Sequence, residues 1–239
     1  MKTIVPHIWC DRNAVEAAEF YARLFPRTTW SIDSRYPHEG LLDFQKEFAG
    51  LPLTVGLSID GFPMVLINAG SEFRPNLSIS FMLNFDPLFF DDDAVAARGA
   101  LDALWEGLTD GGVVRMEKGE YPFSAHYGWV EDRYGVNWQL MLTNPAGDPR
   151  PFICPALMFG GPAQNMCELA VSHYLDVFPN SGWGNRVTYP VPTGPATEAS
   201  LMFSDFTLAG QWFVAMDSGV EQEESFTCGV SFEVSCVVQ

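Results

Sequence analysis

Apolar and polar positions along the chain change between the period of strands and the period of helices in an order that recurs. Ile4 to Trp9 is a short apolar run of β-forming residues, and from Ala14 to Phe25 apolar residues return at steps of three and four, which predicts one helix face. Three more runs have β character: Thr28 to Ser34, Leu53 to Ile59 and Phe62 to Asn68. Asp60-Gly61 is a strong hairpin signal between the last two. The first 75 residues therefore predict a β-α-β-β-β unit.

Two local signals set the ends of these first elements. Pro6 inside the first run predicts an edge or bulged strand, because proline cannot donate to a central ladder. Asn13, followed by Glu16 three residues on, predicts a capping box at the start of the helix, and Pro26 ends that helix.

The same order of elements returns after residue 76. A strand is expected at Ser78 to Asn84, then a helix capped by Asp93 and ended by Gly111-Gly112. Three strands follow: Val113 to Lys118, Tyr127 to Glu131 and Val136 to Leu142. The second unit is thus also β-α-β-β-β.

A third copy begins after a linker rich in proline and polar residues at 145–151. Ile153 to Pro179 repeats the apolar run, helix pattern and closing Phe-Pro of Ile4 to Pro26, and Gly61 to Asn68 matches Gly210 to Asp217. Ile79-Ser80-Phe81 then matches Val230-Ser231-Phe232, and the copy stops at Gln239. We expect a complete domain at 1–144, made of units 1–75 and 76–144, and a partial second domain at 152–239, made of one unit and one strand.

The last strand of this arrangement, Gly229 to Cys236, lacks the neighbours that its copy has. Either the chain is shortened, or another subunit covers that edge, since open strand edges recruit partners. A homodimer is therefore expected.

Composition narrows the classes of partner. A formal charge of −17 opposes binding to nucleic acid, which needs clustered Lys and Arg. No run is apolar for the roughly 18 residues that a membrane helix needs, and the start has no secretory signal, so a soluble, cytoplasmic protein without a membrane partner is expected. Five scattered cysteines without a CxxC pair indicate reduced, structural thiols.

Several motifs resemble one family. They are Pro6-His7-Ile8-Trp9, Phe20-Tyr21 with Phe25-Pro26, Ile79-Ser80-Phe81, and above all the stretch from Gly128 to Gln139, GWVEDRYGVNWQ. They look like the PhnB-like branch of the glyoxalase/bleomycin-resistance (vicinal oxygen chelate) superfamily. The resemblance implies an α+β fold in which paired βαβββ units form a cupped mixed sheet around a cavity, often in a dimer.

In metal-using relatives, the resemblance implies four ligands from the first and last strands of each unit. His7 falls at the first position, Asn68 lies near the second, Ser78 or Ile79 near the third, and Gln139 at the fourth, where glyoxalase-type enzymes place a carboxylate. One imidazole with amides and no carboxylate predicts a degenerate site, with at most a weakly held divalent metal such as Zn, Ni or Mg on His7 and Gln139. Ala156 takes the place of His7 in the third copy.

Residues that could contact a ligand follow from the same alignment. Asn68, His7 and Gln139 are the polar candidates; for His7 and Gln139 the alternative is a structural residue satisfied by internal hydrogen bonds. Four aromatic residues could form a wall of the cavity or belong to the core: Trp9, Phe81, Trp129 and Trp138.

Two functions from different classes remain. The first is a binding module for a small organic ligand, and the second is a metal-dependent enzyme of the glyoxalase, isomerase or dioxygenase type. The missing carboxylates favour the first. Some members of the family are described as 3-demethylubiquinone-9 3-methyltransferases, but the sequence has no Gly-rich loop between a strand and a helix to hold a nucleotide-like methyl donor.

Overall fold

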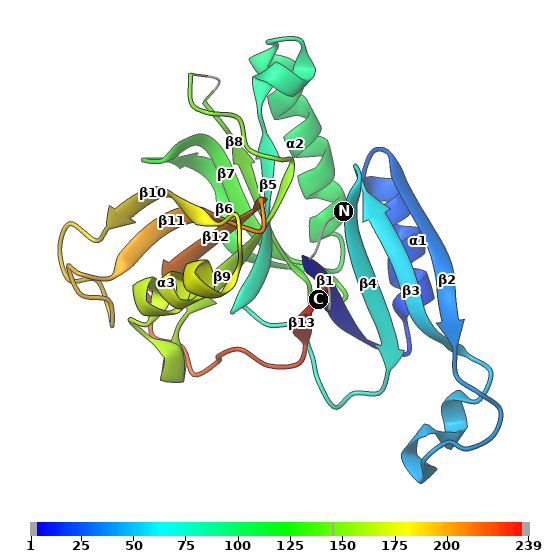
Figure 1. The fold of residues 1–239 in the computed structure, drawn as a ribbon. Coiled ribbons are helices and arrows are strands. Elements are labelled where there is room, and N and C mark those ends of the chain that lie inside the picture. Colours follow the sequence, from blue (N-terminus) through cyan, green and yellow to red (C-terminus); the bar gives the residue numbers. More distant parts are fainter. Residues whose placement is uncertain (1–3, 145, 236–239) are drawn as a thin grey trace. The chain divides into compact units, whose positions relative to one another are not determined.

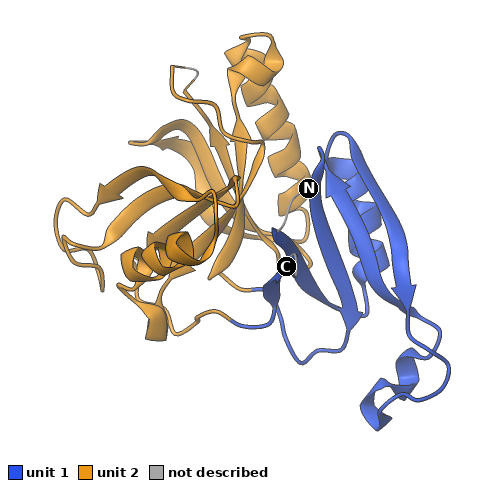
Figure 2. Ribbon diagram, viewed as in Figure 1, with its two compact units in different colours: residues 1–75, 227–239 blue, residues 76–226 orange. Residues whose placement is uncertain are grey.

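The computed structural model describes residues 4–144 and 146–235, and their strands form two separate sheets (Figure 1). The chain divides into two compact units, one of residues 1–75 with 227–239 and the other of residues 76–226 (Figure 2). Each unit contains one of the sheets, and each is described by itself below.

The first unit is a five-stranded sheet in the order β13-β1-β4-β3-β2, with one α-helix and a short 3₁₀ helix. Its elements are β1 (Ile4–Asp11), α1 (Ala14–Leu24), β2 (Thr28–Arg35), η1 (Asp43–Phe48), β3 (Pro52–Ile59), β4 (Phe62–Ala69) and β13 (Val230–Val234). Along β1, buried residues alternate with half-buried ones, because α1 covers one face of the sheet only.

Pro6 does not place β1 at an edge, so that expectation is wrong. The strand lies between β13 and β4. Parallel pairing with β4 begins at His7 opposite Val65, one residue after the proline, so no N–H is needed there toward β4. Pro155 is placed in the same way. The parallel pairing of its strand with the strand that contains Val214 begins one residue after the proline, at Ala156.

The start of α1 also differs from the predicted capping box. The Asn13 side chain makes no capping hydrogen bond. Instead Asn68 Oδ1 accepts from the Ala14 backbone N–H at 3.2 Å. A side chain 54 residues away therefore caps the helix, which local spacing does not reveal. The predicted cap of the second helix is confirmed, because Asp93 Oδ1 accepts from Val95 N and Ala96 N.

The second unit is an eight-stranded mixed sheet in the order β10-β11-β12-β9-β5-β8-β7-β6. The elements from residues 76–144 are β5 (Ile79–Phe85), η2 (Pro87–Phe90), α2 (Ala94–Thr109), β6 (Val113–Tyr121), β7 (Ser124–Glu131) and β8 (Asn137–Leu142). Those from the third copy are β9 (Ile153–Phe159), η3 (Gly161–Ala163), α3 (Cys167–Val177), β10 (Gly182–Thr188), β11 (Leu201–Leu208) and β12 (Gln211–Asp217). Two βαβββ units thus share one mixed sheet, as expected.

The units that share the sheet are the second and third copies. β5 pairs antiparallel with β9, with Ser80 opposite Ala156. In the smaller sheet β1 pairs antiparallel with β13 in the corresponding way, with His7 opposite Ser231. The structure therefore groups the repeats differently from the expected division, in which units 1–75 and 76–144 share a sheet. In each sheet, the first strand of one copy pairs with the first strand of another copy. Long-range strand pairing therefore decides which copies share a sheet.

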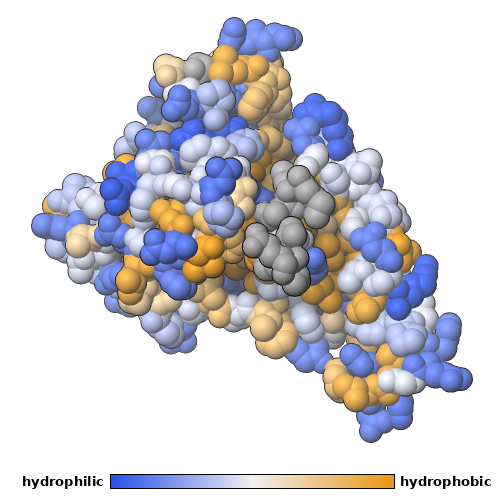
Figure 3. All heavy atoms as spheres, in the orientation of Figure 1, coloured by the Kyte–Doolittle hydropathy of each residue, from blue (hydrophilic) through white to orange (hydrophobic). Residues whose placement is uncertain are grey.

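Apolar side chains are exposed on the loop around η1 in the first unit, where orange atoms gather at the lower right of Figure 3. Leu42 and Phe44 are 60% and 62% exposed.

Three cysteines are buried: Cys10, Cys154 and Cys167. Burial raises the pKa of the Cys167 thiol. Cys236 lies outside the described residues. In the part of the chain that is described, no helix is both long and apolar enough to cross a membrane.

Candidate ligand-binding site

Alternation along β5 divides the side chains of the larger sheet between two faces. Phe81 and Leu83 are fully buried on the face that α2 covers, and Phe81 packs against Trp138 at 5.3 Å between ring centroids. Met82 points to the opposite face, which we call the inner face, where it clusters with Cys154, Ala156 and Val214 from β9 and β12.

A hydrogen-bonded network crosses the inner face. Gln139 Nε2 donates to Ser80 Oγ at 2.8 Å, and the Tyr127 hydroxyl donates to Gln139 Oε1 at 2.8 Å. Trp129 Nε1 donates to Asn137 Oδ1 at 3.1 Å. Burial raises the pKa of Tyr127, with a smaller contribution from Tyr121, so the hydroxyl stays protonated and donates at neutral pH. Gln139 is 2% exposed and both ends of its amide are satisfied.

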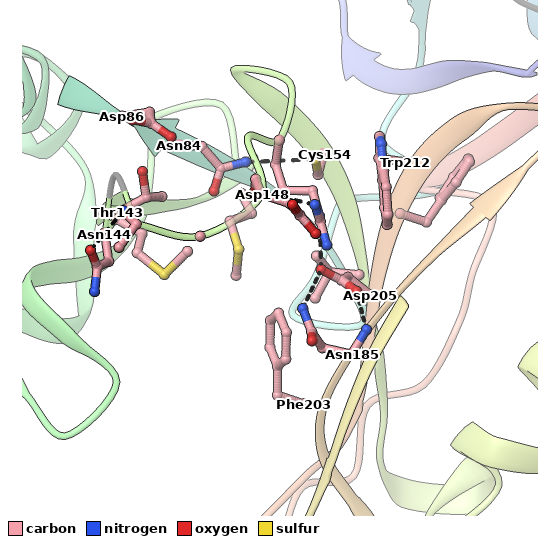
Figure 4. A pocket seen from close by; sticks show the side chains of 17 residues that line it. Asn84, Asp86, Thr143, Asn144, Asp148, Cys154, Asn185, Phe203, Asp205 and Trp212 are labelled. Atoms are coloured by element: carbon pink, nitrogen blue, oxygen red, sulfur yellow. Dashed lines mark hydrogen bonds and ion pairs between the residues drawn. The ribbon is translucent and has the colours of Figure 1, made fainter. Parts of the chain in front are cut away.

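A cavity of about 480 Å³ opens beyond this network on the inner face (Figure 4). Its apolar lining combines sulfur-bearing, aromatic and aliphatic side chains: Met82, Met141, Cys154, Phe203, Trp212, Phe213 and Val214. Its volume lies in the range of pockets that bind small molecules. All of its lining residues belong to residues 76–226, the second compact unit.

One wall of the cavity carries an ion pair. Arg150 Nε donates to Asp205 Oδ2 at 2.9 Å, and the guanidinium lies 3.9 Å from the centroid of the Trp212 ring. Asp205 also accepts from the Asn185 backbone N–H at 2.5 Å and from its side-chain amide at 3.4 Å. The Asp205 carboxylate is therefore fully provided with donors, and Arg150 is held over an aromatic face.

The other wall is formed where β5 and β8 end. Figure 4 shows Asn84, Asp86 and Thr143 on one side of the cavity, with Asp205 and Trp212 on the other. Asn84 Nδ2 donates to Pro151 O at 2.8 Å. Thr143 N donates to Phe85 O at 3.1 Å, which holds Thr143 beside the end of β5. The Thr143 hydroxyl oxygen is buried and has no hydrogen-bond partner among the described residues.

The seven residues predicted to contact a ligand are divided between the two units, four in the second and three in the first. Trp129 and Gln139 lie on the inner face of the larger sheet, whereas Phe81 and Trp138 are in the core beneath α2. The Trp138 indole donates to Asp132 Oδ2 at 2.8 Å. These two aromatic rings therefore stabilise the second unit rather than line its cavity.

The other three predicted residues belong to the first unit. His7 Nε2 lies 3.0 Å from Glu233 Oε2, an ion-pair contact whose angles do not make a hydrogen bond. Trp9 Nε1 donates to Gly70 O at 2.7 Å, and its ring meets Phe73 edge to face. Asn68 is buried as the cap of α1, and its Nδ2 donates to Pro52 O.

The residues present do not fit the implied metal site. His7 and Gln139 lie on different sheets, and across the described residues no three His, Cys, Asp or Glu side chains gather closely enough to hold an ion. At the centre of the inner face, Met82 is opposite Gln139 and Ala156 is opposite Val214. Of these four only Gln139 offers an oxygen, and that oxygen already accepts from Tyr127.

The cavity residues Arg150, Asp205, Asp86 and Thr143 were not among the predicted site residues. Arg150 lies in the stretch read as a linker, where a single basic residue between prolines carries no local signal. Asp86 follows an apolar strand directly, and this position at a strand end is the signal that could have found it.

Two βαβββ units in one mixed sheet define the class: the chain has the fold of the glyoxalase/bleomycin-resistance (vicinal oxygen chelate) superfamily. Glyoxalase I from Zea mays has this fold and is 12% identical, with a TM-score of 0.50, over 90% of this chain and 67% of that chain. The chain belongs to the PhnB-like family described as 3-demethylubiquinone-9 3-methyltransferase, which matches residues 2–141 and 151–239. The resemblance read from the sequence is thereby confirmed.

Smaller solved structures match part of the chain. A PhnB protein from Bacillus cereus is 25% identical, with a TM-score of 0.49, over 59% of this chain and 100% of that chain. A protein from Pseudomonas aeruginosa is 21% identical, with a TM-score of 0.46, over 59% of this chain and 98% of that chain. No curated protein matches the sequence.

Proposed function

We propose that this protein binds a small organic molecule in the cavity of the second unit, with no need for a divalent ion at the positions that metal-using relatives employ. The observation that carries the proposal is the cavity of about 480 Å³, with a floor of methionine and aromatic side chains between two polar walls. Ligand pockets combine such an apolar lining with a few placed polar groups. Methionine side chains adapt to irregular ligand shapes.

The enzymatic alternative is a glyoxalase, isomerase or dioxygenase that uses a metal as Lewis acid. It needs imidazole or carboxylate donors on the inner face. Met82 and Trp129 flank Gln139 on the neighbouring strands, and Ala156 and Val214 pair with each other on β9 and β12, so nothing in this donor set favours the alternative.

A ligand-observed NMR screen of small aromatic and aliphatic fragments tests the proposal. Hits should be lost in Val214→Phe, which adds a ring to the cavity floor, because Val214 is 3% exposed and lines the cavity. The matched control is Met202→Phe on the adjacent strand β11, since Met202 is 40% exposed and does not line the cavity. Hits that survive Val214→Phe in a folded protein would contradict the proposed site.

We also propose that two copies of the chain associate through β13. Three features support this. Within the described ranges 4–144 and 146–235, β13 is an end strand of its sheet, and Val234 on it is 40% exposed. The corresponding strand β9 has a parallel partner, β12, on the side where β13 has no described neighbour. An open edge presents unpaired backbone N–H and C=O groups to a second strand.

A further inference from the structure

We propose that the cavity selects an organic cation, a compact aromatic or apolar body that carries a protonated amine, and that Asp86 is its counter-charge. This inference rests on the proposed function and names the class of ligand for the same cavity.

Asp86 is a buried carboxylate with little internal compensation. It is 3% exposed, at the end of β5, and lines the cavity. Its Oδ1 accepts from Leu88 N at 3.0 Å, and no other donor among the described residues reaches the carboxylate. A buried charge with a single neutral donor is costly, so a positively charged group from outside the protein stabilises it.

Asp205, on the opposite wall of the same cavity, differs from Asp86 because protein donors reach both of its carboxylate oxygens. It receives the Arg150 guanidinium and two donors of Asn185. Arg150 is thus neutralised, and the face of its guanidinium is covered by Trp212. Among the described residues of the lining, Arg150 is the only cation, and it is already paired within the protein, which leaves Asp86 without one.

The balance of charge in the lining favours a cation over an anion. The described residues of the lining include three aspartates, Asp86, Asp148 and Asp205, and one arginine, Arg150, which together carry a formal charge of −2. An anionic ligand would lack a free positive partner and would meet two uncompensated carboxylates. A cationic ligand would be attracted by both, and more strongly by the buried one, because solvent screens it less.

Thr143 adds a second acceptor beside Asp86. Its hydroxyl oxygen is buried and has no hydrogen-bond partner among the described residues. Thr143 directly follows β8, the strand next to β5, and its backbone N–H donates to Phe85 O. An ammonium group has three N–H donors, which a carboxylate and a hydroxyl can share. Met82, Phe203 and Trp212 supply apolar and aromatic surface for the body of the ligand.

The experiment compares three probes of nearly equal shape by NMR titration at neutral pH: 2-phenylethylamine, which is protonated, neutral 2-phenylethanol, and the anion 3-phenylpropanoate. We expect the amine to bind at least about tenfold more tightly than the alcohol, which corresponds to about 1.4 kcal/mol, and the carboxylate to bind most weakly. In Asp86→Asn the preference for the amine should disappear while the alcohol binds as before. The asparagine side-chain oxygen still accepts from Leu88 N, so the turn into η2 keeps its cap.

Thr143→Val and Asp148→Asn complete the test. Thr143→Val should weaken the amine several-fold, whereas Asp148→Asn, at an exposed position of the same lining, should change little. If the alcohol binds in the cavity and the amine binds no better, or if Asp86→Asn keeps the preference, the inference is overturned while the proposed function stands. If no probe binds, both are overturned.

Discussion

Asn68 and Asp217 hold the same place in two copies of the repeat, and each caps the helix of its own copy. Asn68 Oδ1 accepts from Ala14 N at the start of α1, and Asp217 Oδ1 accepts from Cys167 N at the start of α3. Their second polar atoms differ in direction. Asn68 Nδ2 donates to Pro52 O, whereas Asp217 Oδ2 accepts from Leu201 N at 2.9 Å. Amide and carboxylate are thus each matched to the group that faces them.

Exchanging the two residue types should destabilise the protein at either site. Asp217→Asn turns an amide N–H toward Leu201 N, and Asn68→Asp turns a carboxylate oxygen toward Pro52 O. We expect each change to lower the free energy of unfolding by about 1–3 kcal/mol, the cost of a buried polar group left unsatisfied. Urea unfolding at pH 7 measures both. A neutral outcome at both sites would show that the helix cap alone matters.

The pH dependence of the Asp217 contribution has a defined sign. Burial raises the pKa of Asp217, more than the backbone donors of Leu201 and Cys167 lower it. A carboxyl with a raised folded-state pKa contributes stability that is present below its unfolded pKa and is lost as pH rises through the folded pKa. The difference in unfolding stability between wild type and Asp217→Asn should therefore be larger near pH 4 than at pH 7. Equal differences at the two pH values would refute this.

Asp102 should show the opposite dependence. Burial would raise its pKa, but hydrogen bonds from His126 Nε2 at 2.7 Å and Lys118 Nζ at 2.5 Å lower it overall. A depressed pKa gives stability that is present above the unfolded pKa and is lost as pH falls through the folded pKa. Asp102→Asn should cost more at pH 7 than at pH 3, by about 0.5 kcal/mol after solvent screening.

A matched control for this effect is Asp110→Asn. Asp110 also pairs with a basic side chain, that of Arg133, but its own side chain is 80% exposed. Thermal unfolding at both pH values should show a smaller change for Asp110→Asn than for Asp102→Asn. The reverse order would mean that the partly buried cluster around His126 does not add stability.

Gln139→Glu tests whether the inner face can become a metal site. Because Gln139 is 2% exposed and both of its amide atoms are bonded, we expect the buried carboxylate to lower the free energy of unfolding by about 1–3 kcal/mol, with no gain in Zn or Ni affinity by calorimetric titration. Tyr127→Phe serves as the comparison, since it removes one partner of Gln139 without adding charge. A tighter metal complex in a stable variant would revive the metal hypothesis.

Self-association through β13 should respond to a charge on that strand. Val234→Lys places a lysine on the open edge, and we expect it to shift the protein toward monomer in light scattering at micromolar concentration. Val187→Lys is the matched control, because Val187 is 44% exposed on β10, the end strand of the other sheet. If both variants behave as the wild type does, the interface lies elsewhere or the chain is monomeric.

The sequence by itself determined the local elements of this protein. Periodicity and turn residues place the strands, the helices and the Asp93 cap, because these depend on neighbours a few residues apart. The repeated motifs also determined the family. Only tertiary structure decided which copies share a sheet, that Asn68 caps α1, and that Arg150 meets Asp205 across 55 residues. The physical reason is that every copy presents an equivalent first strand, so local pattern cannot choose among partners that differ only in long-range packing.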